Sequence, residues 1–499
     1  MRGVLIGIAI LLASVFALFG GFLAWGYIYG LTYEYDAPEH VDLVPNEYNT
    51  VTAVGNGLYD ENGDRFDIKG INYGNLFVTE GWMTVNSMGA MLNSDGTYTK
   101  VNEQGIVEEY EEIYQEEMDK VLSRFTNEQI DNLYDAFFNS YCTESDFKLI
   151  SDMGMNTIRL PMYFRNFLTT EYRYRLDTNG DDVDDTDEIL CSMNFEDIEL
   201  VFDKLDKFLG YAKKYDLKVI IDMHGVMGGQ SGYEHCGTRD IDFWDNEEYI
   251  EFMCNLWKAI AEHYINDRPD LASTILAYDL ANEPTNRNEV GTGPKQWAVM
   301  DKLYQAIRSV DKHHVISIEG VWFPVSLPSP EKYGWENVLY QCHYYNWSGT
   351  GVSNETFYSF IFGLASLVES HDVPLLVGEF NLFGDYDAWL KYLNQYDKMG
   401  WGWTIWSYKI ISVGWWDNSW GLAVNKMNLK NGSPEELYAK PEEERNLKLD
   451  LTTATYEEIY EMWSNEYTEY DGQQGKYKLY EDGVTYRALK QYFADLKNK

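Results

Sequence analysis

The stretch TILAYDLANEP, residues 274–284, decides the fold, because it is one of eight short apolar runs that recur along the 499-residue chain. Another run of the same kind is PLLVGEF, residues 374–380. Continuous apolar runs of this length are typical of strands that are buried on both faces. In chain order the eight runs lie at residues 66–73, 156–161, 218–225, 274–284, 314–320, 338–345, 374–380 and 403–408.

Between these runs, apolar residues recur at helical spacing, and several of the helical patterns begin after an Asp, Asn, Ser or Thr N-cap. Alternation of strand and helix along the whole chain predicts a parallel sheet, and eight such units most naturally close into a (β/α)8 TIM barrel. The helical patterns cover residues 143–154, 195–215, 246–264, 295–310, 356–370 and 387–398.

Two stretches, near residues 80–140 and 413–475, are longer than the barrel requires. Both follow the C-terminal end of a strand, which is the catalytic face of such a barrel. We therefore expect these insertions to wall the substrate cleft within one barrel domain, residues 51–499. A small independent domain in one of them is the alternative.

The N-terminus contains an uncharged apolar stretch, residues 4–29, preceded only by Met1 and Arg2. Its length matches a hydrocarbon core of about 30 Å, so we expect residues 1–30 to be a transmembrane helix that anchors the chain, followed by a stalk at 31–50. A cleavable signal peptide is the alternative. Arg2 places the N-terminus in the cytoplasm, which predicts a single-pass membrane protein with an extracellular catalytic domain; secretion is the alternative.

The formal net charge is −42, which disfavours binding to nucleic acid because an acidic protein repels phosphates at long range. A neutral substrate fits this charge better.

Two of the apolar runs carry an acidic residue near their end: Glu283 in TILAYDLANEP and Glu379 in PLLVGEF. Because the carboxyl ends of barrel strands meet at one face, we expect both side chains in a single cleft. Two carboxylates in one cleft are the equipment for cutting a glycosidic bond, since one protonates the leaving oxygen and the other attacks the sugar.

Other strand ends carry Arg159 in NTIRLP, His224 in DMHG, His343 and Tyr345 in CHYY, and Trp406 in TIWSY. Together with Asn282-Glu283-Pro284 and Gly378-Glu379, these positions resemble the pattern of glycoside hydrolase family 5, a clan of retaining β-glycosidases on the eightfold barrel. The resemblance runs from about residue 55 to the C-terminus.

By this resemblance Glu283 is the acid/base and Glu379 the nucleophile, and the chemistry requires no cofactor. Retention requires the two carboxyl groups to be about 5–5.5 Å apart. Arg159 beside Glu379 would hold the nucleophile ionised, and Tyr345 would orient it by a hydrogen bond. The substrate-binding residues are then completed by Asn282 at the sugar 2-hydroxyl, His224 and His343 at other hydroxyls, and Trp406 beneath the ring.

Two stretches suggest the substrate. GINYGNLFVTEGW, residues 70–82, resembles the first-strand stretch of fungal exo-β-1,3-glucanases, in which an acidic residue at the place of Glu80 holds the terminal sugar. HGVMGGQSGYEHCG, residues 224–237, is similar to the loop after their third strand. Both imply a pocket and exo action on β-glucan. A departure is Phe380 after Glu379, where those enzymes carry Trp.

Three alternatives stay open: an endo-β-1,4-glucanase (cellulase), a mannanase, and a surface carbohydrate-binding protein without turnover. The presence of both glutamates argues against the last. Aromatic residues that follow strand ends, and on which sugars could stack, are Trp322, Phe323, Trp347, Trp415, Trp416 and Trp420.

The segment DTNGDDVDDTDE, residues 177–188, resembles a calcium-binding loop with an acidic twelfth position. Its glycine stands at the fourth place, not the sixth. A structural calcium site and an acidic solvated loop therefore both remain open. The candidate oxygen ligands are Asp177, Asn179, Asp181, Asp185 and Glu188.

Overall fold

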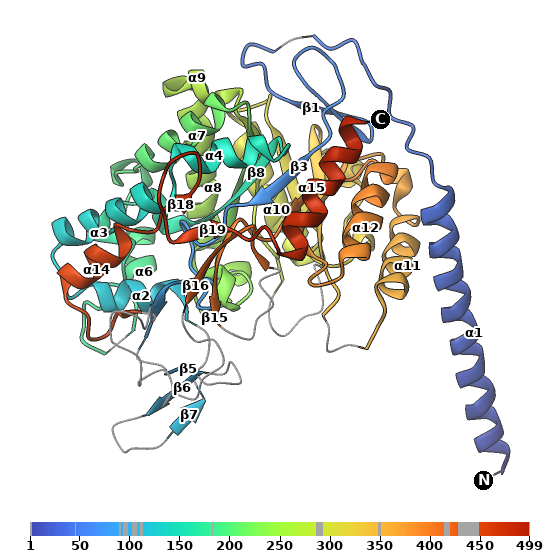
Figure 1. Ribbon diagram of the computed structural model, residues 1–499, viewed down its shortest axis with the longest axis horizontal. Coiled ribbons are helices and arrows are strands. Elements are labelled where there is room, and N and C mark those ends of the chain that lie inside the picture. The colour runs from blue at the N-terminus through green and yellow to red at the C-terminus, as the bar shows by residue number, and fades with distance from the viewer. Residues whose placement is uncertain are drawn as a thin grey trace.

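Figure 1 shows the computed structural model of the chain. It describes residues 2–498 except 45, 89–90, 93–97, 102–106, 110–112, 182, 286–292, 348–350, 414–419 and 428–448. For residues 2–16, the described parts of 91–109, 412–413 and 426–427, it describes the backbone elements alone.

Eight parallel strands close into a barrel, which confirms the predicted (β/α)8 fold. The last strand pairs with the first through the register Trp403 to Lys69, so the sheet has no free edge. Most of the strand residues are buried, which explains their continuous apolar sequences. The strands are β3 (Lys69–Asn72), β8 (Thr157–Tyr163), β9 (Lys218–Gly225), β10 (Ile275–Asp279), β11 (Val315–Glu319), β12 (Val338–Tyr345), β13 (Leu375–Asn381) and β14 (Gly402–Ile405).

Amphipathic helices surround the barrel and pack their apolar faces on the strands (Figure 1). Several begin at the caps that the sequence predicted; the Asn246 side chain, for example, accepts hydrogen bonds from the backbone N–H groups of Glu248 and Tyr249. The helices that follow the pattern are α4 (Glu144–Asp152), α7 (Asp203–Lys214), α8 (Glu247–Glu262), α10 (Pro294–Arg308), α11 (Asn354–Ala365), α12 (Tyr386–Met399) and α15 (Val484–Lys497).

The N-terminal end of the barrel is closed by the hairpin of β1 (Thr52–Val54) and β2 (Gly57–Tyr59). Val51 and Leu58 pack there against Leu276 and other apolar residues of the barrel strands. The opposite end, where the strands end, is therefore the end that is available to a substrate.

The two predicted insertions follow β3 and β14, and they contact each other. In the first, β4 (Asn86–Ser87) pairs in parallel with β17 (Leu449–Asp450) of the second. Trp463 donates a hydrogen bond to the Asn86 side chain over 3.0 Å, and its ring lies 5.4 Å from that of Phe137. The other elements are β5 (Met91–Leu92), β6 (Tyr98–Val101), β7 (Val107–Glu109), α2 (Gln115–Leu122) and α3 (Asn127–Tyr141), then β15 (Lys409–Val413), β16 (Ala423–Met427), α14 (Tyr456–Trp463), β18 (Thr468–Glu469) and β19 (Tyr477–Leu479).

Helix α1 (Arg2–Thr32) covers the predicted membrane span and lies beside α11 (Figure 1). Within the described residues, none of the helices combines the length and the apolar character needed to cross a membrane. The predicted transmembrane helix is therefore not confirmed. The predicted stalk residues contact the barrel instead of standing clear, as in the hydrogen bond from Tyr59 Oη to the Pro38 carbonyl.

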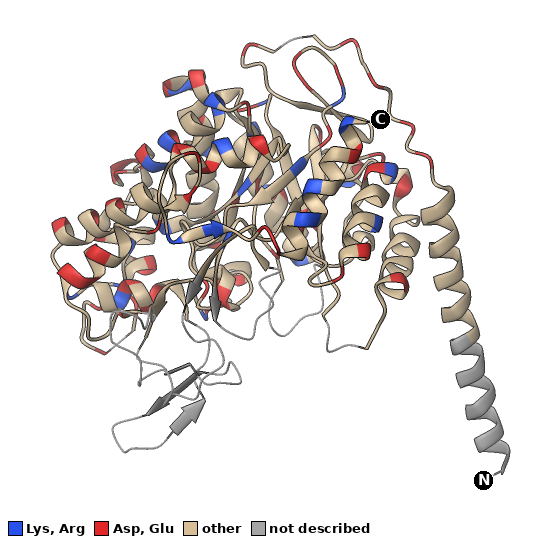
Figure 2. Cartoon of the chain, viewed as in Figure 1, with Lys and Arg blue, Asp and Glu red and all other residues tan. Residues whose placement is uncertain are grey.

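Charge is distributed unevenly over these elements. Figure 2 shows many Asp and Glu positions along the helices around the barrel, whereas residues 17–32 of α1 include no charged residue. This difference makes α1 the most apolar surface element among the described residues.

Candidate active site

A cleft of about 870 Å³ opens at the C-terminal ends of the barrel strands. It contains both predicted carboxylates, Glu283 and Glu379, together with most of the predicted substrate-binding side chains. The lining residues among those predictions are Glu80, His224, Asn282, His343, Tyr345 and Trp406.

Glu379 is near the end of β13 and is almost fully buried. One of its oxygens accepts a hydrogen bond from Arg159 over 2.9 Å, and the other accepts one from Tyr345 Oη over 2.9 Å. Burial raises the pKa of Glu379, while the Arg159 charge and the Tyr345 hydrogen bond oppose that rise. Both residues that the sequence placed beside Glu379 therefore contact it.

Arg159, on β8, is fully buried and connects the nucleophile to the neighbouring strands. Its guanidinium also donates to Asp279 over 3.0 Å and lies 3.0 Å from Asp222. The same group donates to Asn282 Oδ1 over 2.8 Å. Three carboxylates around one guanidinium compensate a charge that would otherwise be very costly to bury, so the position of Glu379 is fixed by the barrel core.

Glu283 lies four residues beyond the end of β10, and its φ of 40° is in the left-handed region that non-glycine residues seldom adopt. Such a conformation costs on the order of 1–3 kcal/mol and is found where the surrounding structure determines it. Here the Glu283 N–H donates to Glu319 Oε2 over 2.9 Å. The Glu283 carboxyl group lies 3.0 Å from His343 Nδ1 and 3.5 Å from His235 Nε2.

His343 Nδ1 lies between the two glutamates, 3.0 Å from Glu283 Oε1 and 3.5 Å from Glu379 Oε2. The distance between Glu283 Oε1 and Glu379 Oε2 therefore cannot exceed the sum of these two distances. A limit of this size for one pair of oxygens is compatible with the ~5–5.5 Å spacing of the two carboxyl groups in retaining enzymes. Burial lowers the pKa of His343 to about 3, so the imidazole between the carboxyl groups is neutral at ordinary pH.

Trp406 and His224 form the floor of the cleft. Their rings are stacked, with centroids 5.5 Å apart and an interplanar angle of 12°. His224 Nδ1 is 2.6 Å from Asp222, and His224 Nε2 is 3.4 Å from the Asn282 amide. Burial lowers the pKa of His224 well below its usual range. The floor therefore presents an aromatic face and neutral hydrogen-bonding groups, which suits a sugar.

At one end of the cleft, Glu80 accepts a hydrogen bond from Trp82 Nε1 over 2.8 Å. Glu234, which the sequence did not single out, lies beside it, and its carboxylate accepts the Gly81 N–H. Burial and the Glu234 charge raise the pKa of Glu80. This end concentrates carboxylates that can bind sugar hydroxyls.

Sequence reasoning also missed Glu319, Asp222 and Asp279, although each had a visible signal. Glu319 ends the run HVISIEG as Glu283 and Glu379 end theirs. The two aspartates are charged residues inside apolar runs, and a buried charge requires a partner of opposite sign. Arg159 is that partner.

Four of the six predicted stacking aromatics, Trp322, Phe323, Trp347 and Trp420, line the cleft. The other two, Trp415 and Trp416, lie outside the described residues.

The structure does not confirm the candidate calcium loop. Asp177, Asn179 and Asp181 accept hydrogen bonds from backbone N–H groups of their own loop. Asp185 accepts one from Thr178, and Glu188 accepts one from Tyr249. Among the described residues, one group of three potential metal ligands converges, and it is Glu283, Glu319 and His343 in the cleft. The spacing had left a calcium site and an acidic solvated loop both open, and calcium binding stays a prediction.

Comparison with known proteins agrees with this geometry. The model of the family described as Cellulase (glycosyl hydrolase family 5) matches residues 114–412. The chain belongs to glycosyl hydrolase family 5. Within this family, it is 26% identical over 237 residues to a β-xylosidase of Phanerodontia chrysosporium, and 26% identical over 228 residues to a glucan 1,3-β-glucosidase 2 of Candida albicans.

The match covers 46% of this chain and 43% of the β-xylosidase, and 45% of this chain and 40% of the glucosidase. The chain thus spans less than half the length of these relatives. A probable glucan 1,3-β-glucosidase A of Aspergillus fumigatus is 22% identical, over 71% of this chain and 72% of that protein. Among solved structures, a rutinosidase from Aspergillus niger has a TM-score of 0.49 and 15% identity, over 80% of this chain and 98% of that chain.

Proposed function

We propose that the protein is a retaining β-glycosidase that removes terminal sugar units from β-glucan by double displacement. The observation that carries the proposal is the position of His343 within 3.5 Å of both Glu283 and Glu379, with Glu379 held by Arg159 and Tyr345. Two carboxyl groups this close, in unlike surroundings, divide the roles of acid and nucleophile.

In the first step Glu379 attacks the anomeric carbon while Glu283 gives its proton to the leaving oxygen. His343 Nδ1 lies 3.0 Å from Glu283 Oε1 and His343 Nε2 lies 3.5 Å from Glu319 Oε1, so the imidazole helps to hold the Glu283 carboxyl group in position. The leaving group departs as a neutral alcohol. Glu283, now a carboxylate, then takes a proton from water as the water attacks the glycosyl ester, and the β-configured sugar and free Glu379 are restored.

Exo action is supported by the Glu80 end of the cleft. Glu80, Trp82 and Glu234 place carboxylates and an indole where the terminal sugar of a chain would end. The names of several distant relatives as glucan 1,3-β-glucosidases point in the same direction. An extracellular location is part of this proposal, because a polysaccharide substrate would lie outside the cell.

A product time course with the full chain on laminarin, mixed-linkage glucan, cellulose oligomers and mannan tests the function. We expect early glucose from laminarin, abolished in Glu283→Ala and Glu379→Gln and retained in the surface control Glu331→Gln. Early oligosaccharides from cellulose or mannan would replace the exo assignment with an endo one. Binding of glycan without turnover, unchanged in Glu379→Gln, would indicate a carbohydrate-binding protein.

A further inference from the structure

The cleft has a second half whose chemistry differs from that of the Glu80 end. Trp322 and Phe323 follow β11, and Phe360 projects from α11. Phe19 and Leu23 of helix α1 continue the same lining. We propose that this apolar half binds leaving groups of a second kind, so that the enzyme also cleaves amphiphilic β-glycosides with an apolar aglycone. The inference rests on the proposed function, from which it takes the chemistry, and adds a substrate class to it.

The position of Glu283 separates the two halves. Glu283 follows β10, which lies between β9 and β11 in the barrel. On the β9 side the lining includes Glu234 and His235, close to Glu80 from the loop after β3. A terminal sugar carries several hydroxyl groups that need such polar partners when they leave water. The general acid stands at the leaving oxygen, so the group beyond it on the other side is the aglycone.

The β11 side offers mainly apolar contacts. The Phe360 ring lies 6.2 Å from Phe19, 5.8 Å from Phe22 and 6.4 Å from Phe323, measured between centroids. Aromatic faces alone would also suit stacking by a second sugar. The same wall, however, contains aliphatic side chains, which offer a sugar neither a ring face nor a hydrogen bond: Leu23, Val352 and Ile361. A mixed aromatic and aliphatic wall next to the acid suits an alkyl or aryl group better.

Helix α1 is a fixed part of this wall. A Cβ atom at Gly26 would overlap the Ser359 carbonyl oxygen, so the two helices approach as closely as glycine permits. Trp25 Nε1 donates to Ser366 Oγ over 3.0 Å, and Gln395 donates to the Gly30 carbonyl over 2.6 Å.

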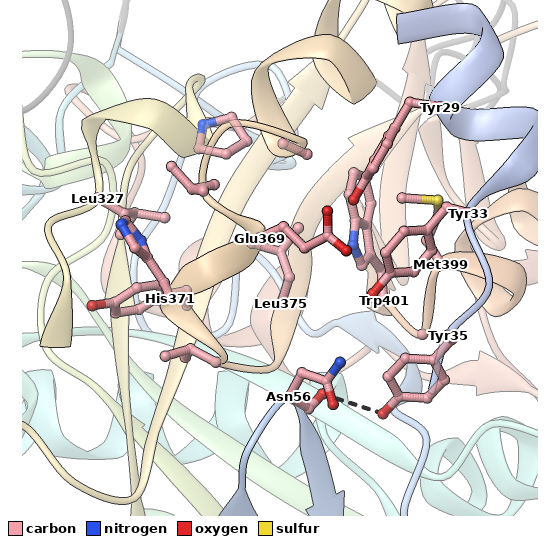
Figure 3. A pocket seen from close by; sticks show the side chains of 16 residues that line it. Tyr29, Tyr33, Tyr35, Asn56, Leu327, Glu369, His371, Leu375, Met399 and Trp401 are labelled. Carbon is pink, nitrogen blue, oxygen red and sulfur yellow. Dashed lines mark hydrogen bonds between the residues drawn. The ribbon is translucent and has the colours of Figure 1, made fainter. Parts of the chain in front are cut away.

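Beyond Gly30, the chain continues along the barrel. In Figure 3, Tyr29 and Tyr33 point toward Glu369 and Trp401, and Tyr35 donates to the Asn56 carbonyl over 3.2 Å. The cavity among them measures about 70 Å³, far less than the cleft, so it holds no substrate and marks where α1 is attached. The attachment keeps Phe19 and Leu23 at the mouth of the cleft.

The test compares three simple glucosides with the full chain: methyl, benzyl and octyl β-glucoside, the last below its critical micelle concentration. We expect kcat/KM for octyl β-glucoside to exceed that for methyl β-glucoside by about tenfold or more. All three release an alkyl-type alcohol, so the comparison reports contacts with the aglycone: preference for octyl assigns the wall to alkyl chains, and preference for benzyl alone assigns it to aromatic groups.

Leu23→Ser should lower the octyl-to-methyl ratio of kcat/KM about fivefold, because it places a hydroxyl in the wall. The matched control is Leu18→Ser on the same helix, where the leucine is 75% exposed and outside the cleft lining; it should keep the ratio. If Leu23→Ser does not fold, the constants for competitive inhibition of the wild type by octyl β-thioglucoside and by methyl β-thioglucoside give the same comparison.

Hydrolysis of all three glucosides with equal kcat/KM would overturn the aglycone site and leave the proposed function intact. If the chain hydrolyses neither these glucosides nor laminarin, the proposed function itself is overturned.

Discussion

The hydrogen bond from Tyr345 to Glu379, the proposed nucleophile, should control the acidic limb of the pH profile. Tyr345 Oη donates to Glu379 Oε2 over 2.9 Å in a partly buried setting. A hydrogen bond to a charged group contributes about 1.5–3 kcal/mol, and about 1.4 kcal/mol corresponds to one pKa unit. The Tyr345→Phe substitution removes the donor and keeps the ring, which stacks 5.4 Å from Trp347.

The sign follows from which form the donor favours. Tyr345 stabilises the carboxylate, so its loss raises the pKa of Glu379. Glu379 reacts only when ionised. As the pH is lowered, Tyr345→Phe therefore loses activity at a higher pH than the wild type does. We expect the acidic limb of kcat/KM to move upward by about one to two pH units, with a smaller change on the plateau.

The assay is kcat/KM for an aryl β-glucoside between pH 3 and 8. Tyr344→Phe is the matched control, because Tyr344 is adjacent on β12 and strand alternation directs it to the opposite face; its limb should stay in place. An unmoved limb in Tyr345→Phe would refute the assignment of Glu379 as the ionised nucleophile.

Four further predictions follow from the contacts of the cleft and of α1. Glu319→Ala should lower kcat, and it should lower the free energy of unfolding by about 1–3 kcal/mol, because the Glu283 N–H loses its buried acceptor. Glu319→Gln keeps an acceptor and should preserve both quantities. Burial lowers the pKa of His343 to about 3 and that of His235 to about 4, below the ~6.5 of an exposed histidine. The unfolded chain therefore binds more protons than the folded protein between these values. The free energy of unfolding, measured with urea, should be highest above pH ~6.5 and should decrease as the pH falls toward 4 and 3. Glu80→Gln should lower kcat/KM for laminaribiose by roughly tenfold to a hundredfold with little change in Tm, since a hydroxyl partner is weakened. Gly26→Leu should reduce the unfolding free energy by about 1–3 kcal/mol, because its side chain overlaps Ser359.

Each of these has an outcome that would contradict it. Equal kcat in Glu319→Ala and wild type would remove Glu319 from the positioning of the acid. Stability that is flat from pH 7 to 4 would contradict neutral buried histidines. An unchanged kcat/KM for laminaribiose in Glu80→Gln would contradict Glu80 as a partner of a sugar hydroxyl. Gly20→Leu is the control for Gly26→Leu, because nothing lies within 4 Å of that position.

The barrel could be predicted from the sequence because strands that are buried on both faces have a recognisable apolar pattern. Each strand is a continuous apolar run, and helices with one apolar face separate the runs. The two glutamates could be placed in one cleft for the same reason, since parallel strands end at a common face. Strand ends alone also offer Glu319, so the choice of Glu283 and Glu379 depended on the resemblance to glycoside hydrolase family 5.

Other features depend on contacts between distant residues. Gly26 meets Ser359 across more than three hundred residues, and a hydropathy pattern cannot distinguish a helix that packs on α11 from one that crosses a bilayer. The acidic loop at 177–188 has ligand spacing, but spacing does not say which way the oxygens point. The role of Glu319 was visible as a strand-end glutamate, yet only the structure shows its bond to the Glu283 N–H.

The stereochemistry of hydrolysis tests the central claim most directly. Proton NMR during the first minutes of hydrolysis of an aryl β-glucoside by the full chain distinguishes the two anomers of the released sugar before they interconvert. Double displacement through Glu379 predicts that the β-anomer appears first. First appearance of the α-anomer would show inversion and would contradict the assignment of Glu379 as a nucleophile.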